Sequence, residues 1–189
     1  MVLRNFLTSL SIEFGPVTLF FIGALVFNFF VGVALLMAAT LLSILVSQLR
    51  DGRVPLFSLI ASVFVLLSGA ATLVTMDPWW VVLEYTLYNA LFGIAMVVGY
   101  VRNQPALKPL FETMFQITDK GWHILSLRWG IFFILTAIGS EVVWRTFSYD
   151  EWVYYRFVMV VVLGIFGFSQ FFLARRERLP HASDWGLRK

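Results

Sequence analysis

The sequence predicts an all-α, polytopic integral membrane protein, because its charged residues are confined to short islands between long apolar blocks. No Asp, Glu, Lys or Arg occurs from Phe14 through Leu49. Each later block is about as long as the roughly 20 residues that a helix needs to cross a bilayer. These blocks cover residues 54–76, 79–101, 124–144 and 152–174.

The composition supports this class. Hydrophobic residues make up 60% of the chain, charged residues only 13%, and the mean hydropathy is +0.84. A soluble domain carries about 25% charged residues. The net charge of +3 comes from basic residues at the edges of the apolar blocks, which argues against a nucleic-acid-binding protein. Cysteine is absent, which excludes disulfides and cysteine metal sites.

The first apolar run has two interpretations. As one helix, residues 14–49 would be about 50 Å long, well above the roughly 30 Å of the hydrocarbon core. Either residues 14–30 and 31–49 both cross, with a turn near Asn28–Gly32, or a single span over 31–49 follows a re-entrant or interfacial helix. We therefore expect one transmembrane domain over 1–189 with five firm spans. A sixth, N-terminal crossing stays open, and so does the side on which the N-terminus lies.

Local signals place several helix ends. Asp77-Pro78 is typical of a helix N-terminus, and Ser148 with Glu151 has the spacing of a capping box. Between the third and fourth spans, apolar residues recur at helical spacing over 105–120, which predicts an amphipathic interfacial helix on the cytoplasmic surface. The alternative is that this segment packs on the protein's own loops. The residues concerned are Leu107, Leu110, Phe111, Met114 and Phe115.

The basic residues predict an orientation. The islands at 50–53, 102–120 and 175–189 are rich in Lys and Arg, whereas those at 77 and 145–151 are poor. Loops rich in basic residues stay on the cytoplasmic side of the membrane. We therefore expect the C-terminal tail, residues 175–189, to be cytoplasmic.

Four ionisable side chains lie inside the apolar blocks near the predicted outer interface. Such groups are costly in lipid and are functional suspects by default. We expect them to form one intramembrane charge network, and an ion-pair clamp that fixes helix packing is favoured over a substrate or lipid-headgroup site or a proton relay. Two of them are four residues apart, so they share a helix face and can pair. The four are Glu84, Glu141, Arg145 and Arg156.

The other polar side chains in the blocks have simpler expected roles. Asn28, Asn89 and Gln170 are candidates for hydrogen bonds between helices. Arg128, one turn into its block, is a candidate contact for lipid phosphates.

Signatures of catalysis are missing from the sequence. Neither His123 nor His181 has a carboxylate or a second histidine at ligand spacing. The usual hydrolase, phosphate-binding and metalloprotease motifs are absent. We therefore predict no catalytic, cofactor-binding or metal-binding residue.

The stretch Gly121–Arg145 carries a distinctive pattern, a Trp-x-x-Leu-x-x-Arg-Trp-x-x-Phe-Phe motif followed by Glu-Val-Val-Trp-Arg. It resembles the intracellular septation protein A family, also called YciB, whose members span the inner membrane of Gram-negative bacteria. Earlier matches, such as Gly15-Pro16 and Lys108-Pro109-Leu110, extend the resemblance over nearly the whole chain. At Glu84 the family usually has a lysine, so this chain resembles a divergent member and the role of that position stays open. The motif residues are Trp122, Leu125, Arg128, Trp129, Phe132 and Phe133.

The resemblance implies a non-enzymatic inner-membrane protein that supports envelope integrity, membrane homeostasis and septation through protein or lipid contacts. The implied partners are membrane lipids and membrane proteins of cell division and elongation, with no nucleic acid and no cofactor; a homo-oligomer is a further option. An alternative from the residues is a small transporter or channel, or a lipid-handling protein, that uses the outer charge cluster. A water-filled path to Glu84 and Glu141 would favour it, and a dry, packed interior would count against it.

Overall fold

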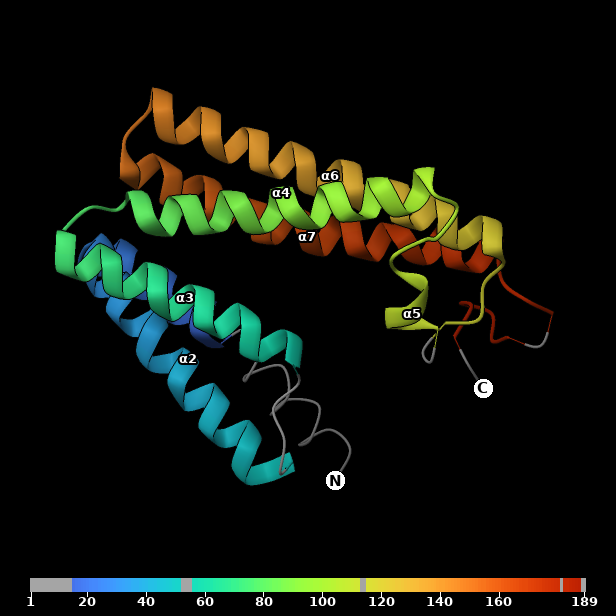
Figure 1. The fold of residues 1–189 in the computed structure, drawn as a ribbon, viewed down its shortest axis with the longest axis horizontal. Helices are drawn as coiled ribbons and strands as arrows, with labels where there is room; N and C mark the ends of the chain where they lie inside the picture. The colour runs from blue at the N-terminus through green and yellow to red at the C-terminus, as the bar shows by residue number, and fades with distance from the viewer. Residues whose placement is uncertain (1–14, 52–55, 113–114, 181, 188–189) are drawn as a thin grey trace. The chain divides into compact units, whose positions relative to one another are not determined.

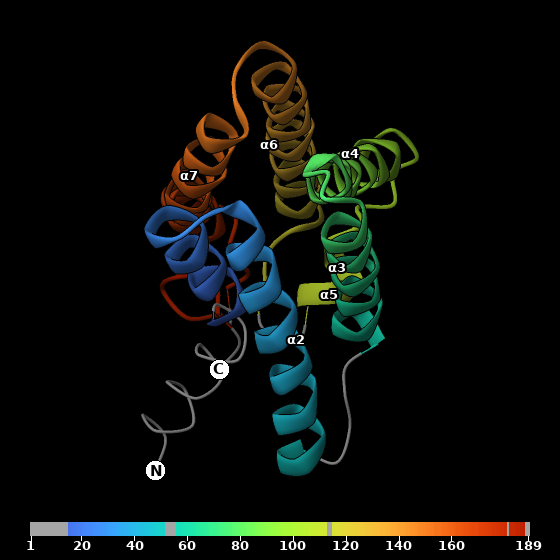
Figure 2. The same cartoon turned by 90° about the vertical axis from the view of Figure 1, so that its left-hand side faces the viewer.

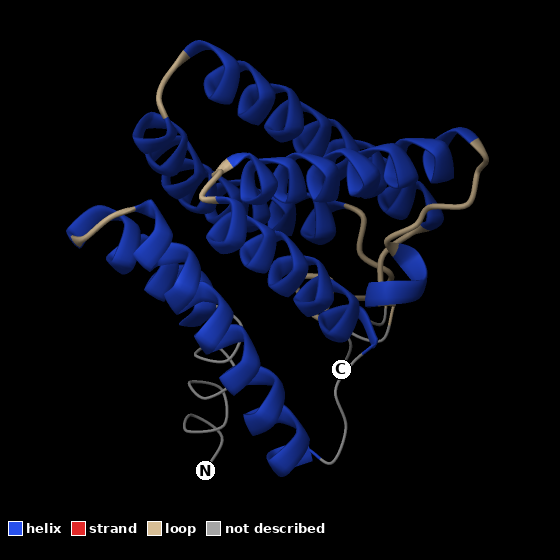
Figure 3. Ribbon diagram, turned by 60° about the vertical axis from the view of Figure 1, so that its left-hand side comes forward, coloured by secondary structure: helices blue, strands red, loops and turns tan. Residues whose placement is uncertain are grey.

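Helices make up all the regular elements in the residues that the computed structural model describes, 15–51, 56–112, 115–180 and 182–187 (Figure 3). A helix over Gly15–Val26 comes first. The predicted all-α membrane class is confirmed. The labelled helices are α2 (Phe29–Asp51), α3 (Leu56–Thr75), α4 (Trp79–Val101), α5 (Lys108–Phe111), α6 (Asp119–Thr146) and α7 (Tyr149–Arg176) (Figure 1).

Four of the described helices, α2, α4, α6 and α7, are long and apolar enough to cross a membrane. Helix α3 has 20 residues, which also matches the length of a crossing. These five helices coincide with the five firm spans. Helices α6 and α7 have 28 residues each and extend beyond their apolar blocks at both ends, because polar residues continue the helix past the apolar region.

The first apolar run is interrupted at Phe27 and Asn28. The described helix Gly15–Val26 is shorter than a crossing requires, whereas α2 has 23 residues. The Asn28 side-chain oxygen accepts a hydrogen bond from the Val31 amide at 3.0 Å and so caps the start of α2. A turn near this asparagine, which two crossings would require, is therefore present. Helix α2 has the length of one complete span, and a crossing by the first helix stays an open alternative.

The predicted helix starts at Asp77 and Ser148 are confirmed as well. The Asp77 carboxylate accepts a hydrogen bond from the Trp79 amide at 2.9 Å, at the start of α4. At the start of α7, the Glu151 carboxylate accepts from the Ser148 amide at 2.6 Å, and the Ser148 hydroxyl accepts from the Glu151 amide at 3.4 Å. This reciprocal pair is a capping box.

The chain divides into two compact units. The N-terminal unit consists of the chain up to Glu84 together with Phe147–Val153, and the C-terminal unit consists of Tyr85–Thr146 and Tyr154–Lys189. Helices α4 and α7 therefore contribute their first residues to the N-terminal unit and the rest to the C-terminal unit.

Within the N-terminal unit, the first helix packs tightly against α2. A Cβ atom added to Gly23 would lie 2.7 Å from the Gly32 Cα atom, so the two backbones approach as closely as glycine allows. Helix α2 also packs along α3 (Figure 2). Aromatic rings fill this unit: Phe29 lies 6.0 Å from Phe20 and 6.4 Å from Trp152, and all three side chains are buried.

In the C-terminal unit, α4, α6 and α7 run side by side, with α6 antiparallel to the other two (Figures 1 and 2). We call the end at which α6 finishes and α7 begins the hairpin end, and the opposite end the tail end. Helices α4 and α6 meet at two glycines, because a Cβ atom on Gly93 would lie 2.9 Å from the Gly130 carbonyl oxygen. Such small residues let membrane helices pack closely.

Aromatic residues of the Trp-and-Phe motif fill the space between α6 and α7. The Phe132 ring stacks on Phe166 at 4.4 Å, and Trp129 meets Phe166 edge-on at 4.9 Å. Phe133 packs beside Trp129 at 5.6 Å. These residues of the motif therefore hold the two helices together.

The predicted interfacial helix over 105–120 is wrong. Among the described residues between Pro105 and Thr118, only Lys108–Phe111 form a helix, and α6 already begins at Asp119. The intervening residues bond to the tail: the Gln116 amide donates to the Gly186 carbonyl at 2.7 Å, and the Thr118 amide donates to the Glu177 carbonyl at 2.8 Å. Because these two amides donate to the tail, they are not part of a helical hydrogen-bond pattern.

Of the apolar residues predicted for that helix, Leu107 and Phe115 pack against a core formed mainly by helices rather than by loops. Phe111 is exposed, and Met114 lies outside the described residues. Leu107 and Ile117 are buried in a core with Met96, Trp122 and Ala174 at the tail end. Burial at the tail end thus accounts for Leu107 and Phe115 without a longer helix. Outside this core, Lys108 bonds to the Asp119 carboxylate at 2.6 Å, which raises the pKa of the lysine ammonium.

Candidate functional site

Polar side chains from α4, α6 and α7 meet near the hairpin end of the C-terminal unit. The Thr86 and Ser140 hydroxyls hydrogen-bond at 2.8 Å, which links α4 to α6. The Tyr155 hydroxyl donates to the Thr136 carbonyl at 2.7 Å, which links α7 to α6. Ser140 and Thr136 are fully buried. We call this group the polar cluster: Tyr85, Thr86, Thr136, Ser140, Tyr155 and Arg156.

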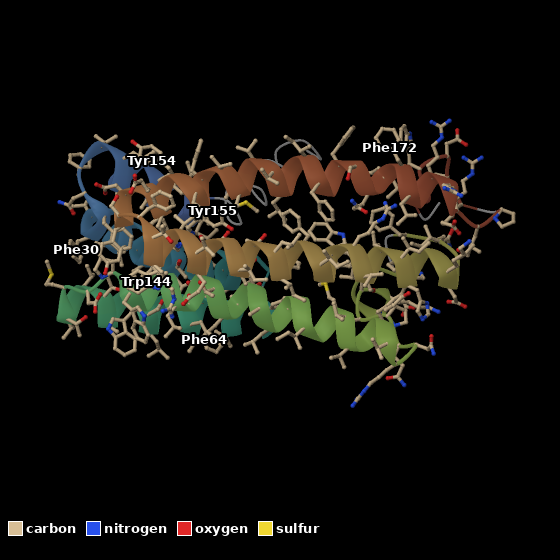
Figure 4. All side chains as sticks on the ribbon, turned by 90° about the horizontal axis from the view of Figure 1, so that it is seen from above. Phe30, Phe64, Trp144, Tyr154, Tyr155 and Phe172 are labelled. Atoms are coloured by element: carbon tan, nitrogen blue, oxygen red, sulfur yellow. The ribbon has the colours of Figure 1, made fainter. Side chains whose placement is uncertain are left out.

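A glycine makes room for the bond between α6 and α7. Figure 4 shows Tyr155 pointing from α7 toward α6. A Cβ atom on Gly139 would lie 2.5 Å from the Tyr155 hydroxyl, so a larger residue there would displace the ring. The adjacent Tyr154 is exposed and lies on a different side of α7. These two neighbouring tyrosines therefore have different surroundings.

Arg156 is the charged member of the polar cluster. It is only 7% exposed, and its guanidinium lies 5.0 Å from the centre of the Tyr85 ring. A charged side chain inside a membrane helix is costly, and a cation–π contact offsets part of that cost. The structure thus holds this arginine of α7 against α4 by its contact with the Tyr85 ring.

The other predicted network residues lie in different surroundings. Arg145 donates to the Glu141 carboxylate in a salt bridge one helical turn apart, and the two side chains are 70% and 37% exposed. Glu84 belongs to the N-terminal unit, directly before Tyr85. Within the C-terminal unit, the structure therefore pairs Glu141 with Arg145 and stacks Arg156 on Tyr85; a network of all four residues stays a prediction.

The uncharged candidates mainly bond within their own helices. The Asn89 amide donates to the Tyr85 carbonyl at 2.8 Å, one turn back in α4. The Gln170 amide donates to the Phe166 carbonyl at 3.1 Å, and its oxygen accepts a long hydrogen bond, 3.5 Å, from Arg128 on α6. Arg128 is otherwise exposed, and its contact with lipid phosphates stays a prediction.

Sequence reasoning missed most of the polar cluster. Thr86, Thr136 and Ser140 are small hydroxyl residues whose side chains can bond to their own helix, so they carry no cost that would single them out. Tyr155 stands beside the exposed Tyr154, and the sequence alone does not show which of the two faces α6. The available signal was the Gly139-Ser140 pair, since two small residues beside each other mark a close helix contact.

The described residues contain no group of three His, Asp or Glu side chains that could hold a metal ion. His123 bonds through Nδ1 to the Asp119 carbonyl at 2.8 Å, and its ring lies edge-on to Tyr100. The polar cluster itself offers one cation and several hydroxyls. Its chemistry is that of hydrogen bonding and helix attachment.

Comparison with known proteins gives a consistent result. The family model of intracellular septation protein A matches residues 9–179. The inner membrane-spanning protein YciB of Afipia carboxidovorans is 34% identical over 94% of this chain and 89% of its own length. Its counterpart in Agrobacterium fabrum is 36% identical over 67% of this chain and 62% of its own length. No solved structure matches. The chain therefore belongs to the intracellular septation protein A family of inner membrane-spanning proteins.

Proposed function

We propose that this protein is a non-enzymatic scaffold of the bacterial inner membrane that supports septation and envelope integrity through contacts with lipids and with membrane proteins of division and elongation. The family name supports the link to septation. The observation that carries the scaffold role is the polar cluster, in which hydroxyl, carbonyl, ring and guanidinium groups contact one another across three helices.

The hydrogen bonds within the polar cluster argue for a role in helix packing, because the polar groups of a reaction site must be available to a substrate. The Thr86 and Ser140 hydroxyls are occupied by each other, and the Tyr155 hydroxyl is occupied by a backbone carbonyl. The Glu141–Arg145 pair is equally self-contained, and its opposite charges cancel at the membrane surface. The contacts that serve septation then belong to the outer surfaces of the helices and to their ends.

The orientation forms part of the same proposal. The tail end carries Arg175, Arg176 and Arg178, and loops rich in basic residues stay in the cytoplasm. The tail end would then face the division machinery, and the hairpin end would face the periplasm.

A complementation experiment tests the proposal. A bacterial strain that lacks its own family member is supplied with the wild-type chain or with the double variant Thr86→Val and Ser140→Ala. Cell length and survival under osmotic stress are measured, together with the amount of folded protein in the membrane. We expect wild-type rescue, and rescue by the double variant in proportion to its folded amount. A folded, abundant double variant without activity would contradict the scaffold role and favour transport or lipid handling.

A further inference from the structure

The end of the tail forms a compact turn over residues 183–187. The Gly186 amide donates to the Ser183 carbonyl at 3.0 Å, and the Leu187 amide donates to the Ser183 hydroxyl at 2.9 Å. From the preceding segment, the Arg178 guanidinium donates to the Asp184 carbonyl at 3.0 Å. The turn is therefore built by its own hydrogen bonds, and Arg178 is used to hold it.

Gly186 seats this turn on the end of α7. Its φ of 73° lies in the left-handed region, and an added Cβ atom would lie 2.7 Å from the Ala174 carbonyl oxygen. This close approach brings the Trp185 ring to 6.4 Å from the Phe172 ring. The tail thus folds back onto the side of α7.

That side of α7 faces lipid. Phe168 and Phe172 are 66% and 60% exposed, and Figure 4 shows Phe172 on the side of α7 away from α6. Helix α7 would be about 42 Å long, so its last turns extend beyond a hydrocarbon core of about 30 Å. Trp185, still 42% exposed, then lies at the depth of the lipid headgroups, where tryptophan is preferred.

Arg175 completes the arrangement, with its guanidinium 5.3 Å from the centre of the Trp185 ring. Stacking uses the flat face of the guanidinium and leaves the N–H donors at its edge available for a phosphate. An anionic headgroup is the partner that matches both the charge and the depth.

We propose that Arg175 and Trp185 form a binding site for the phosphate of an anionic phospholipid, with Phe168 and Phe172 in contact with its acyl chains. The site holds one lipid in place beside α7. It goes beyond the septation role and stands whether or not the protein takes part in septation, because it depends only on the tail turn and the end of α7.

Native mass spectrometry of the full chain tests this site, with phosphatidylglycerol and phosphatidylcholine of identical acyl chains as probes. We expect the wild type to bind phosphatidylglycerol more tightly. Arg175→Gln is expected to weaken that binding about fivefold or more. Arg175→Lys keeps the charge but not the flat stacking surface, so it is expected to show most of the same loss.

The neighbouring arginine is the matched control. Arg176→Gln changes the net charge equally, at the same end of the same helix, and is expected to weaken binding less than twofold. Equal losses of phosphatidylglycerol binding in the two glutamine variants would mean that the lipid is attracted by charge in general, and this result would overturn the site. Equal binding of both lipids by the wild type would overturn it as well.

A second readout reports position rather than affinity. The fluorescence of Trp185 is obtained as the difference between the wild type and Trp185→Phe, in bilayers whose lipids carry bromine near the glycerol or near the chain ends. We expect stronger quenching by the shallow bromine. Absence of quenching by either lipid would place the ring outside the membrane and contradict the site.

Discussion

At the scale of single residues, Arg156 shows how a charged side chain is accommodated inside an apolar helix. It is buried, and it stacks on Tyr85 beside hydroxyl groups that bond to each other. A guanidinium presents five N–H donors in a planar fork and no acceptor, so it serves as an attachment point for acceptors and rings on neighbouring helices. This fits a residue that fixes helix positions.

Tyr155→Phe is expected to destabilise the folded protein by about 0.6 kcal/mol, the average for hydrogen bonds between membrane helices. The change removes the donor to the Thr136 carbonyl and keeps the ring. The measurement is unfolding in mixed detergent micelles. Tyr154→Phe is the control, since that tyrosine is exposed, and it is expected to leave stability unchanged. Equal losses of stability in both variants would show that the buried hydrogen bond of Tyr155 contributes no more than an exposed hydroxyl.

The contacts of individual residues were only partly predictable from the sequence. The charged residues were identified because charge in an apolar block is costly, and one pair among them, Glu141 and Arg145, is in contact. The pairing of Arg156 with Tyr85 was not predicted, because which side of α7 faces α4 depends on tertiary packing. Asn28 was a candidate for contact between helices; its side chain caps α2, and a contact with another helix stays a prediction.

At the scale of elements, close contact between backbones explains how the helices associate, which hydropathy alone does not. Helices α4 and α6 meet at Gly93 and Gly130, where backbone atoms leave no room for a side chain. Because lipid chains are as apolar as the helix surfaces, such tight packing is a main source of association between membrane helices.

Gly93→Ala is therefore expected to cost about 1–3 kcal/mol, because its Cβ atom would press on the Gly130 carbonyl. Gly164→Ala in α7 is the matched control. No atom lies within 4 Å of an added Cβ there, so this variant is expected to be neutral or stabilising by up to about 1 kcal/mol. Detergent unfolding compares the two. A neutral Gly93→Ala would contradict the close crossing.

Gly186→Ala is expected to release the tail turn, since alanine disfavours a φ of 73° and its Cβ atom would overlap the Ala174 carbonyl. The Gln116 amide would then lose its partner at Gly186. Hydrogen exchange at Gln116 should become faster, while exchange at Asn89 in the middle of α4 should stay unchanged. Unchanged exchange at Gln116 would show that the turn does not depend on this glycine.

The spans were predictable from the sequence, and the connection between α4 and α6 was not. Apolar length alone specifies a transmembrane helix, because lipid requires every backbone group to bond within the segment. Residues 105–120 lie outside that constraint. The Gln116 and Thr118 amides bond to Gly186 and Glu177, which are distant in sequence, and helical spacing cannot reveal such partners.

At the scale of the whole molecule, the proposed orientation rests on the alternation along the sequence of islands rich and poor in basic residues. Fusions of alkaline phosphatase or a fluorescent protein at Lys189 and at Ser148 test the proposed orientation. We expect fluorescence without phosphatase activity at Lys189 and the reverse at Ser148. Phosphatase activity at Lys189 would show that the orientation is the reverse of the proposed one, with the Arg175 site in the outer leaflet.

The central claim is that the buried polar cluster holds the helices together and that septation depends on the folded shape. The most direct test is Arg156→Gln, measured as rescue of septation per molecule of folded, membrane-inserted protein. We predict a lower folded amount and unchanged rescue per folded molecule, with full rescue when expression is raised to restore that amount. An Arg156→Gln protein that reaches the wild-type folded amount and fails to rescue would contradict the claim, because the arginine would then act on a substrate or partner directly.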